Sequence, residues 1–373
     1  MNNKIKNHVV IISMAVLVAV LSVLCFFGPK PDFLDAERRD PAAFPELSVD
    51  SIMKDGAEYS DSFMSKFETY SLDTFPFRDF FRTVKAICAN YIFGQMDNNN
   101  IFIADGYAAE MQESISDESL EHAAERITFI YEQFLKDKGI KPYLSIIPDK
   151  AYFIAEESGH LSMDYDAFVS RMTDSLSFAE YIDIFPTLSL EDYYKTDTHW
   201  RQEQLGDTAK LLAESMGVPY SGEFDVHLLD HPFYGVYYGQ AALPMPAEDM
   251  YYLTSPTWQD LKVYDYQNNR EISVYDMEKA VGKDPYDMYL SGELSKVTIE
   301  NPDALTDKEL VIFRDSFGRS IIPLLADSYA KITVIDIRYI PNSAFLGSWV
   351  DFENQDVLFL YSTLVLNQSS EMK

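Results

Sequence analysis

The spacing of hydrophobic positions changes several times along this chain, and each spacing predicts a different element. Near the N-terminus, residues 9–27 form an uncharged run in which only Ser13 and Ser22 are polar. A helix rises about 1.5 Å per residue, so a run of this length crosses about one hydrocarbon core. The pattern therefore predicts one N-terminal transmembrane helix.

The charges around this run predict its orientation. Lys4 and Lys6 precede it, and the first acidic residue is Asp32. Because positive flanks stay in the cytoplasm, we expect residues 1–28 to form a cytoplasmic tip and an uncleaved signal anchor. The protein is then a single-pass protein of the cell membrane with an extracellular C-terminal domain. A cleaved signal peptide is the alternative, but the run is long for one and no small-x-small cleavage site follows.

A helical spacing appears further along the chain. Residues 29–110 are expected to form a linker rich in proline and charge, followed by an N-terminal helical region. After Ser116, apolar residues recur every three or four positions and define one helix face. That stripe comprises Leu120, Ala123, Ile127, Ile130 and Phe134. Gly139 is expected to end the helix, and the apolar run 143–147 predicts a buried strand.

Helices and strands continue to alternate towards the C-terminus. Further helices are expected over 168–178, 202–216 and 318–329, and further strands over 181–184, 310–313, 332–335 and 357–361. This alternation is typical of a parallel sheet covered on both faces. Residues 111–373 are therefore expected to form one α/β domain. Residues 220–300, rich in tyrosine, proline and glycine, break the rhythm and are expected to be an insertion over one sheet edge.

Charge and cysteine content narrow the picture. The formal net charge is −30, and the first 30 residues carry lysine but no acid, so the acidity belongs to the outer part. Such a surface repels phosphate, so no nucleic acid partner is expected. Cys25 lies in the apolar run and leaves Cys88 alone outside it. No disulfide can then form within the outer part, and its stability must come from a hydrophobic core.

Two short motifs far apart in the sequence carry the groups of a serine acyl-transfer site. The second motif, Arg314-Asp315-Ser316-Phe317-Gly318, follows a predicted strand and precedes a predicted helix. Folds of the α/β class place reactive groups at such points. Ser316 Oγ would be exposed there, beside helix N-terminal N–H groups that can hold an oxyanion. The structural alternative is that Asp315 or Ser316 only caps the helix.

The first motif, Asp197-Thr198-His199-Trp200, ends an extended aromatic stretch. Side chains two positions apart on an extended segment point to the same side, so Asp197 can hold one nitrogen of His199. The other nitrogen is then free to act as a base. The alternative is a surface aspartate and a histidine that happens to precede a helix. Trp200 and Arg314 are candidate pocket residues, and a core position is the alternative for Trp200.

A histidine pair is a further candidate, for a metal site. His227 and His231 are four positions apart with Asp230 between them, and on a helix they could bind a metal ion. Pro232 follows at once, and no third ligand is evident. We therefore expect no metal, and no cofactor.

Several further blocks occur in a fixed order along the chain. They are Phe44-Pro45-Glu46-Leu47-Ser48, Asp73-Thr74-Phe75-Pro76-Phe77-Arg78, Ile147-Pro148-Asp149-Lys150, Asp197-Thr198-His199-Trp200, Tyr237-Tyr238-Gly239-Gln240, Tyr289-Leu290-Ser291-Gly292, Arg314-Asp315-Ser316-Phe317 and Asp336-Ile337-Arg338-Tyr339. Together they resemble the DHHW family, whose members are related to SGNH-type alginate O-acetyltransferases. Several blocks in the right order are far more specific than any one of them.

The resemblance implies an SGNH or flavodoxin-like α/β/α sandwich with a parallel sheet. It also implies a triad of Ser316, His199 and Asp197, with the oxyanion held by the Ser316 N–H and that of Gly292. Two positions depart from the family pattern. Thr198 replaces the first histidine of the motif, outside the triad, and Glu293 follows Gly292 where an asparagine is expected. If that asparagine lines the oxyanion hole, its loss weakens catalysis.

The resulting first hypothesis is an extracytoplasmic O-acetyltransferase that works through an acetyl-serine. The resemblance implies a cell-surface or extracellular polysaccharide as acceptor and a membrane O-acyltransferase as acetyl donor. A carbohydrate esterase with the same triad is the second hypothesis, since only the acceptor would differ. The third is a non-catalytic polysaccharide-binding or export factor that uses the aromatic region 220–300.

Overall fold

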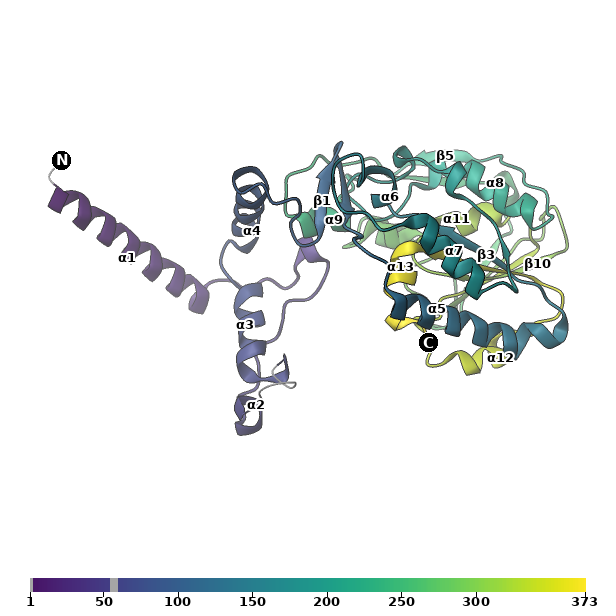
Figure 1. Cartoon of the computed structure of the whole chain (residues 1–373), viewed down its shortest axis with the longest axis horizontal. Helices are drawn as coiled ribbons and strands as arrows, with labels where there is room; N and C mark the ends of the chain where they lie inside the picture. Colours follow the sequence, from purple (N-terminus) through teal and green to yellow (C-terminus); the bar gives the residue numbers. More distant parts are fainter. Residues whose placement is uncertain (1–2, 54–59) are drawn as a thin grey trace. The chain divides into compact units, whose positions relative to one another are not determined.

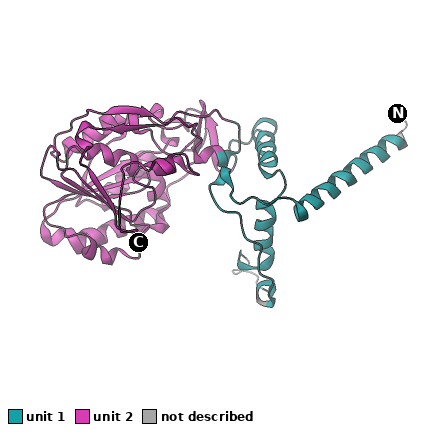
Figure 2. Ribbon diagram, turned by 180° about the vertical axis from the view of Figure 1, so that it is seen from behind, with its two compact units in different colours: residues 1–98, 239–244 teal, residues 99–238, 245–373 magenta. Residues whose placement is uncertain are grey.

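The computed structural model describes residues 3–53 and 60–373 (Figure 1). The chain divides into two compact units (Figure 2). The smaller unit comprises Met1–Asn98 and Gly239–Pro244, and the larger one comprises Asn99–Tyr238 and Met245–Lys373. Both candidate motifs, and nearly all of the blocks from residue 147 onward, belong to the larger unit.

The smaller unit begins with the predicted apolar helix. Helix α1 covers Asn3–Phe27, and its segment Ile5–Phe27 is long and apolar enough to cross a membrane. The most apolar window of that segment has no residue buried in the protein, as expected for a helix whose solvent is lipid. This agrees with the predicted single-pass anchor, although a signal sequence passes the same test of length and composition. The other helices of this unit are α2 (Val49–Met53), α3 (Phe63–Asp73) and α4 (Arg78–Ile87), and a π-helical turn, η3 (Cys88–Ile92), continues α4.

The larger unit is built on an eight-stranded sheet with the order β4-β3-β12-β10-β11-β9-β7-β8. The strands are β3 (Tyr143–Ile147), β4 (Glu180–Tyr181), β7 (Lys262–Asp265), β8 (Arg270–Ile272), β9 (Lys296–Glu300), β10 (Glu309–Arg314), β11 (Lys331–Ile335) and β12 (Asp356–Ser362). Strands β4, β3, β12, β10 and β11 are parallel, as predicted. Strands β9, β7 and β8 are antiparallel and extend one edge. The α/β class is confirmed, with a mixed sheet that is mostly parallel.

The antiparallel edge explains the irregular region 220–300. Strands β7, β8 and β9 of this region continue the main sheet beyond β11, so this part of the region belongs to the sheet. The rest forms a separate hairpin of β5 (Asp225–Leu228) and β6 (Tyr251–Thr254), with the short helices α9 (Val236–Ala241) and α10 (Met277–Ala280). A similar hairpin of β1 (Ile101–Ala104) and β2 (Tyr107–Glu110) opens the larger unit. These short antiparallel pairings lack the long apolar runs that mark the central strands.

The central strands are buried on both faces. In β10, Leu310 and Ile312 pack into one hydrophobic cluster, and Val311 and Phe313 pack into another. This alternation is the two-residue period of a strand between two layers. Helix α8 (Gly206–Ser215) covers the first face, whereas α5 (Asp117–Ile130), α7 (Tyr165–Ser175) and α13 (Thr363–Asn367) cover the second.

Several predicted boundaries differ from the observed ones. The helix expected over 318–329 is only α11 (Gly318–Ile321), followed by a 3-10 turn over Ile322–Leu325. Pro323 has no N–H to donate and cannot continue the α-helical pattern. The strand expected over 181–184 shortens to β4, because a 3-10 turn with Pro186 follows it. The helix expected over 168–178 begins earlier as α7, because the Asp164 carboxylate caps it by accepting from the Ala167 N–H.

Candidate active site

Ser316 lies where the sequence predicts it, at the carboxyl end of a central parallel strand. Strand β10 ends at Arg314, and α11 begins at Gly318. Within residues 310–329, all of them described, Ser316 alone is partly exposed. The hydroxyl is therefore reachable from solvent although its surroundings are packed.

The Asp315 carboxylate holds the turn that presents Ser316. Its Oδ1 accepts from the Phe317 N–H at 3.0 Å, and its Oδ2 accepts from the N–H and hydroxyl of Ser362 at 2.7 and 2.6 Å. Asp315 thus ties the end of β10 to the end of β12 and caps the turn. Gly318 lets that turn pack closely, because a Cβ there would lie 2.7 Å from the Cβ of Arg314. Ser316 is left free of any capping role.

His199 joins the two motifs. Its Nε2 lies 2.8 Å from Ser316 Oγ, and its Nδ1 lies 2.6 Å from Asp197 Oδ1. The ring stacks on Tyr286, with 3.8 Å between ring centroids and 7° between planes. His199 is only 8% exposed, so packing and hydrogen bonds fix the orientation of the imidazole. With Nδ1 protonated and donating to Asp197, Nε2 is the acceptor for the serine proton.

Asp197 is fully buried, and its acceptor positions are occupied. Its Oδ1 also accepts from the His199 N–H at 3.1 Å, and its Oδ2 accepts from the Val236 N–H at 2.8 Å. The neighbouring Gly235 permits this approach, because a Cβ there would lie 2.3 Å from the Asp197 Cα. Sequence reasoning did not find Gly235 or Val236, since a lone glycine between aromatic residues carries no specific signal.

Lys150 supports the same segment from the block 147–150. Its Nζ donates to the Tyr194 carbonyl at 2.8 Å and lies 5.0 Å from the centre of the Tyr237 ring. Burial lowers the pKa of Lys150 to about 7. Tyr237 in turn donates its hydroxyl proton to Thr198 Oγ1 at 3.0 Å. The position that departs from the family motif is therefore held by a tyrosine–threonine hydrogen bond.

The candidate pocket residues Trp200 and Arg314 both lie in the interior with no exposed surface. The Trp200 indole N–H donates to the Phe317 carbonyl at 3.0 Å and to Ser320 Oγ at 2.9 Å, so it joins the two motifs from inside the core. Arg314 pairs with buried Asp336 at 3.1 Å, and burial lowers the pKa of Arg314 to about 10. Both side chains support the site from behind its accessible side.

The two expected oxyanion donors differ in their partners. The Gly292 N–H donates to the Tyr289 carbonyl at 3.1 Å and closes a turn. The Ser316 N–H contacts no acceptor among the described residues and remains available. Glu293, which follows Gly292, is 61% exposed and lies 4.0 Å from the Arg319 guanidinium. Among the two expected donors, the Ser316 N–H is thus the one that can hold an oxyanion without rearrangement.

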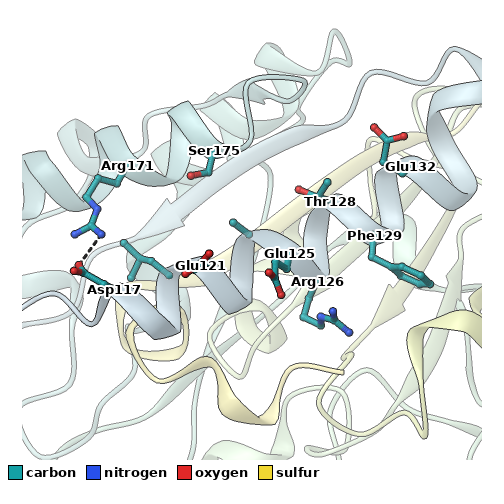
Figure 3. Close-up of a pocket in the computed structure, with 11 residues that line it drawn as sticks. Asp117, Glu121, Glu125, Arg126, Thr128, Phe129, Glu132, Arg171 and Ser175 are labelled. Atoms are coloured by element: carbon teal, nitrogen blue, oxygen red, sulfur yellow. Dashed lines mark ion pairs between the residues drawn. The ribbon is translucent and has the colours of Figure 1, made fainter.

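The hollows on the described surface of the larger unit include the following two. The first, of about 690 Å³, lies beside α5 and α7, where Arg171 reaches Asp117 at 2.6 Å (Figure 3). Arg171 comes from α7, the charged side chains Asp117, Glu121, Glu125 and Arg126 stand along α5, and no triad residue lines this hollow. The second, of about 730 Å³, is lined by Tyr266, Gln267, Glu293, Ser295, Lys296, Tyr339, Pro341, Ser348 and Trp349. It lies beside the carboxyl end of β11, the strand next to β10.

The histidine pair considered for metal binding is not on a helix. His227 belongs to strand β5, its Nε2 lies 2.8 Å from Thr254 Oγ1, and its ring stacks on Tyr252. His231 lies beyond the end of that strand. The helical four-residue spacing that suggested a shared ligand therefore does not apply.

Comparison with known proteins finds likeness in fold. No family model matches the chain, and no curated protein matches it in sequence. A DHHW family protein from Eubacterium siraeum superposes with a TM-score of 0.58 at 18% identity, over 74% of this chain and 95% of that one. Bacillus cereus PatB1 with a sulfonyl adduct gives 0.57 at 17% identity, over 71% and 95%. The O-acetyltransferase domain of Pseudomonas putida AlgJ gives 0.44 at 13% identity, over 72% and 92%.

The fold is therefore a mixed α/β fold, with an edge of antiparallel strands, that is similar to the folds of this DHHW family protein and of PatB1. The predicted resemblance to DHHW proteins is confirmed as a likeness in fold.

Proposed function

We propose that this protein is an extracytoplasmic O-acetyltransferase acting on a cell-surface or extracellular polysaccharide. The α/β/α sandwich would hold the reacting groups, and an acetyl-serine would be the intermediate. The observation that carries the proposal is the unbroken series of short contacts from Ser316 Oγ through His199 to buried Asp197, at 2.8 and 2.6 Å. This order of nucleophile, base and orienting carboxylate is what acyl transfer requires.

In the first half-reaction, Ser316 Oγ attacks the carbonyl carbon of an acetyl donor and gives its proton to His199 Nε2. Asp197 stabilises the imidazolium, and the Ser316 N–H holds the negative oxygen of the tetrahedral intermediate. The intermediate collapses, the donor's leaving group takes the proton from His199, and the acetyl group stays on Ser316 as an ester.

In the second half-reaction, a sugar hydroxyl gives its proton to His199 and attacks the acetyl carbon. The bond to Ser316 Oγ breaks, His199 returns the proton to the serine, and an O-acetylated sugar leaves. Water in place of the sugar would give the esterase instead. The second hollow is not lined by Ser316, His199 or Asp197, but its composition suits a sugar, because Tyr266, Tyr339 and Trp349 offer ring surfaces between amide, hydroxyl and carboxylate groups.

The proposed location follows from the apolar helix. A single-pass anchor in the cell membrane would keep the larger unit in the cell envelope, on the outer side. The polysaccharide acceptor would be met there. The acetyl donor would be supplied through a membrane O-acyltransferase partner, as the resemblance to the DHHW family implies.

The test measures the fate of an acetyl group from an aryl acetate. Wild-type protein should release the aryl alcohol, and adding cellotetraose should speed the release and yield acetylated oligosaccharide. Ser316→Ala should lose this activity, whereas the matched exposed serine variant Ser175→Ala should keep it. Acetate as the sole product would favour the esterase. Equal turnover by wild type and Ser316→Ala would contradict the enzyme and favour the binding factor.

A further inference from the structure

Helix α4 (Arg78–Ile87) has its polarity reversed relative to a surface helix of a soluble protein. Large apolar side chains at helical spacing are all exposed on one side: Phe77, Phe80, Phe81, Val84, Ile87 and, in the π-helical turn that follows, Tyr91. Phe77 and Tyr91 at the two ends of this stripe are 67% and 78% exposed. We call these six residues the α4 apolar face. A surface helix of a soluble protein instead turns such a stripe towards its core.

The inward side of α4 is charged, and its ion pairs fix the orientation. The Arg78 guanidinium donates to Glu37 Oε1 at 2.5 Å and lies 3.7 Å from buried Asp73. Arg82 donates to the Gly239 carbonyl at 3.0 Å and lies 3.4 Å from the same Glu37 oxygen. Rotating the helix to bury its apolar face would break these contacts and leave charges unpaired.

Leaving the α4 apolar face in water would be costly. Apolar surface is worth about 25 cal/mol per Å² when it is removed from water, and each phenylalanine carries a large area. Contiguous exposed patches of this kind mark surfaces that meet a partner or a membrane. The face therefore needs an occupant.

A neighbouring hollow indicates which occupant. A cavity of about 530 Å³ within the smaller unit is lined by Leu24 and Gly28 at the end of α1 and by Phe77 and Phe80 at the start of α4. The apolar face thus begins beside the end of the proposed membrane span. Aromatic residues concentrate at the boundary between hydrocarbon and water, and amphipathic helices lie in that plane.

We propose that the α4 apolar face lies in the interfacial region of the same bilayer that α1 crosses. The occupant is lipid, and α4 acts as an in-plane contact beside the anchor. The inference goes beyond the proposed acetyl transfer and rests on α1 being an uncleaved anchor. The ion-paired side of α4, with Arg78 and Arg82, then faces away from the hydrocarbon, as the polar side of an interfacial helix does.

The test uses the full chain in vesicles of phosphatidylcholine and phosphatidylglycerol. Cys25 and Cys88 are replaced by alanine, and single cysteines for spin labels are introduced as Phe80→Cys, Val84→Cys and Tyr91→Cys. Asp79→Cys is the matched control, because Asp79 is exposed and belongs to the ion-paired side of the same helix, 3.5 Å from Arg78 and 3.9 Å from Arg82. Power saturation then compares the accessibility of each label to oxygen, which partitions into lipid, and to a water-soluble nickel chelate.

Labels at 80, 84 and 91 should be accessible to oxygen and protected from nickel, and the label at 79 should show the reverse. Nickel access at all four positions would place the face in water and overturn the proposal. Protection from both reagents at 80, 84 and 91 would also overturn it, because a protein partner or a second copy would then cover the face. The four labelled positions are exposed on the surface of the protein, so the labels do not disturb a packed core.

Discussion

The hydrogen bonds to the Asp197 carboxylate include three whose donors decide how much one substitution should cost. Two of them come from His199, from its N–H and its Nδ1–H, and the third comes from the Val236 N–H. Asp197 Oδ1 accepts both hydrogen bonds from His199, and Oδ2 accepts the one from Val236. Changing one atom of Asp197 from acceptor to donor should therefore misplace the histidine without removing it.

Asp197→Asn tests this argument. An asparagine keeps the size, but its NH₂ group must face a donor, so His199 would change tautomer or turn away from Ser316. We expect kcat/KM for aryl acetate to fall by roughly 10²–10⁴, less than for His199→Ala, where the base itself is lost. Asp174→Asn, an exposed change on α7, should leave kcat/KM unchanged. A wild-type rate in Asp197→Asn would remove Asp197 from the mechanism.

Lys150 makes a prediction about stability and pH. Because burial lowers its pKa in the folded chain from 10.5 to about 7, the unfolded chain binds more protons between these values. The free energy of unfolding should therefore rise with pH from about 7 to 10.5, by at most about 1.4 kcal/mol per pH unit, relative to Lys150→Met. Below pH 7 both states are protonated, and the difference should be flat.

The measurement is urea unfolding of both proteins across this range, with Lys210→Met as the exposed control. A difference between wild type and Lys150→Met that does not change with pH would mean that Lys150 keeps its ordinary pKa. The control should track wild type at every pH.

At the scale of elements, the accuracy of the sequence predictions follows the kind of contact that defines each element. Strands expected over 310–313 and 332–335 are observed as β10 and β11 with one or two more residues, because strands buried on both faces read as unbroken apolar runs. The antiparallel strands β7 to β9 were not predicted, because their partners are set by tertiary pairing. The helix expected over 318–329 was predicted too long, because it ends before Pro323, which cannot continue the α-helical hydrogen bonding.

In the candidate site too, residues with a local sequence signal were predicted, and residues placed by tertiary contacts were not. The two motifs were predicted to converge because an Asp-x-His pair and a serine after a strand each have a local signal, and the structure brings them together. Gly235 and Val236 contact Asp197 across a long sequence separation and have no local signal, and the block that contains Lys150 does not reveal that its side chain donates to the Tyr194 carbonyl. Their roles appear only once the chain is folded.

Trp200 joins the Asp-x-His segment to the turn that carries Ser316 by hydrogen bonds. Trp200→Phe keeps a ring in the core but removes the N–H that donates to Phe317 and Ser320. We expect a loss of about 1–3 kcal/mol in the free energy of unfolding, because buried acceptors lose their donor. The rate should fall as well, because the turn that carries Ser316 loosens.

Trp258→Phe is the matched control, since its N–H donates to Asp327, outside the two motifs. It should lower stability comparably and leave kcat per folded molecule unchanged. Equal effects of the two variants on kcat would mean that Trp200 has no special link to the site.

At the scale of the whole molecule, the acidic chain and its apolar helix predict one topology. Residues 1–8 should be cytoplasmic, and residues from 31 onward should be accessible to protease added outside intact cells. Mass spectrometry of membrane fractions should find the N-terminal peptide still joined to the outer part. A soluble mature protein that begins near residue 30 would instead establish a cleaved signal and would also remove the basis for the α4 contact.

The central claim is that Ser316 carries the acetyl group during turnover. Wild-type protein is mixed with an aryl acetate, quenched in acid within the first turnovers, and mapped by peptide mass spectrometry. The account predicts one added acetyl group on the peptide containing Ser316, absent in Ser316→Ala and strongly reduced in His199→Ala. Cellotetraose added before the quench should speed its loss. Turnover without acetyl-Ser316, or acetylation unchanged in His199→Ala, would contradict the account.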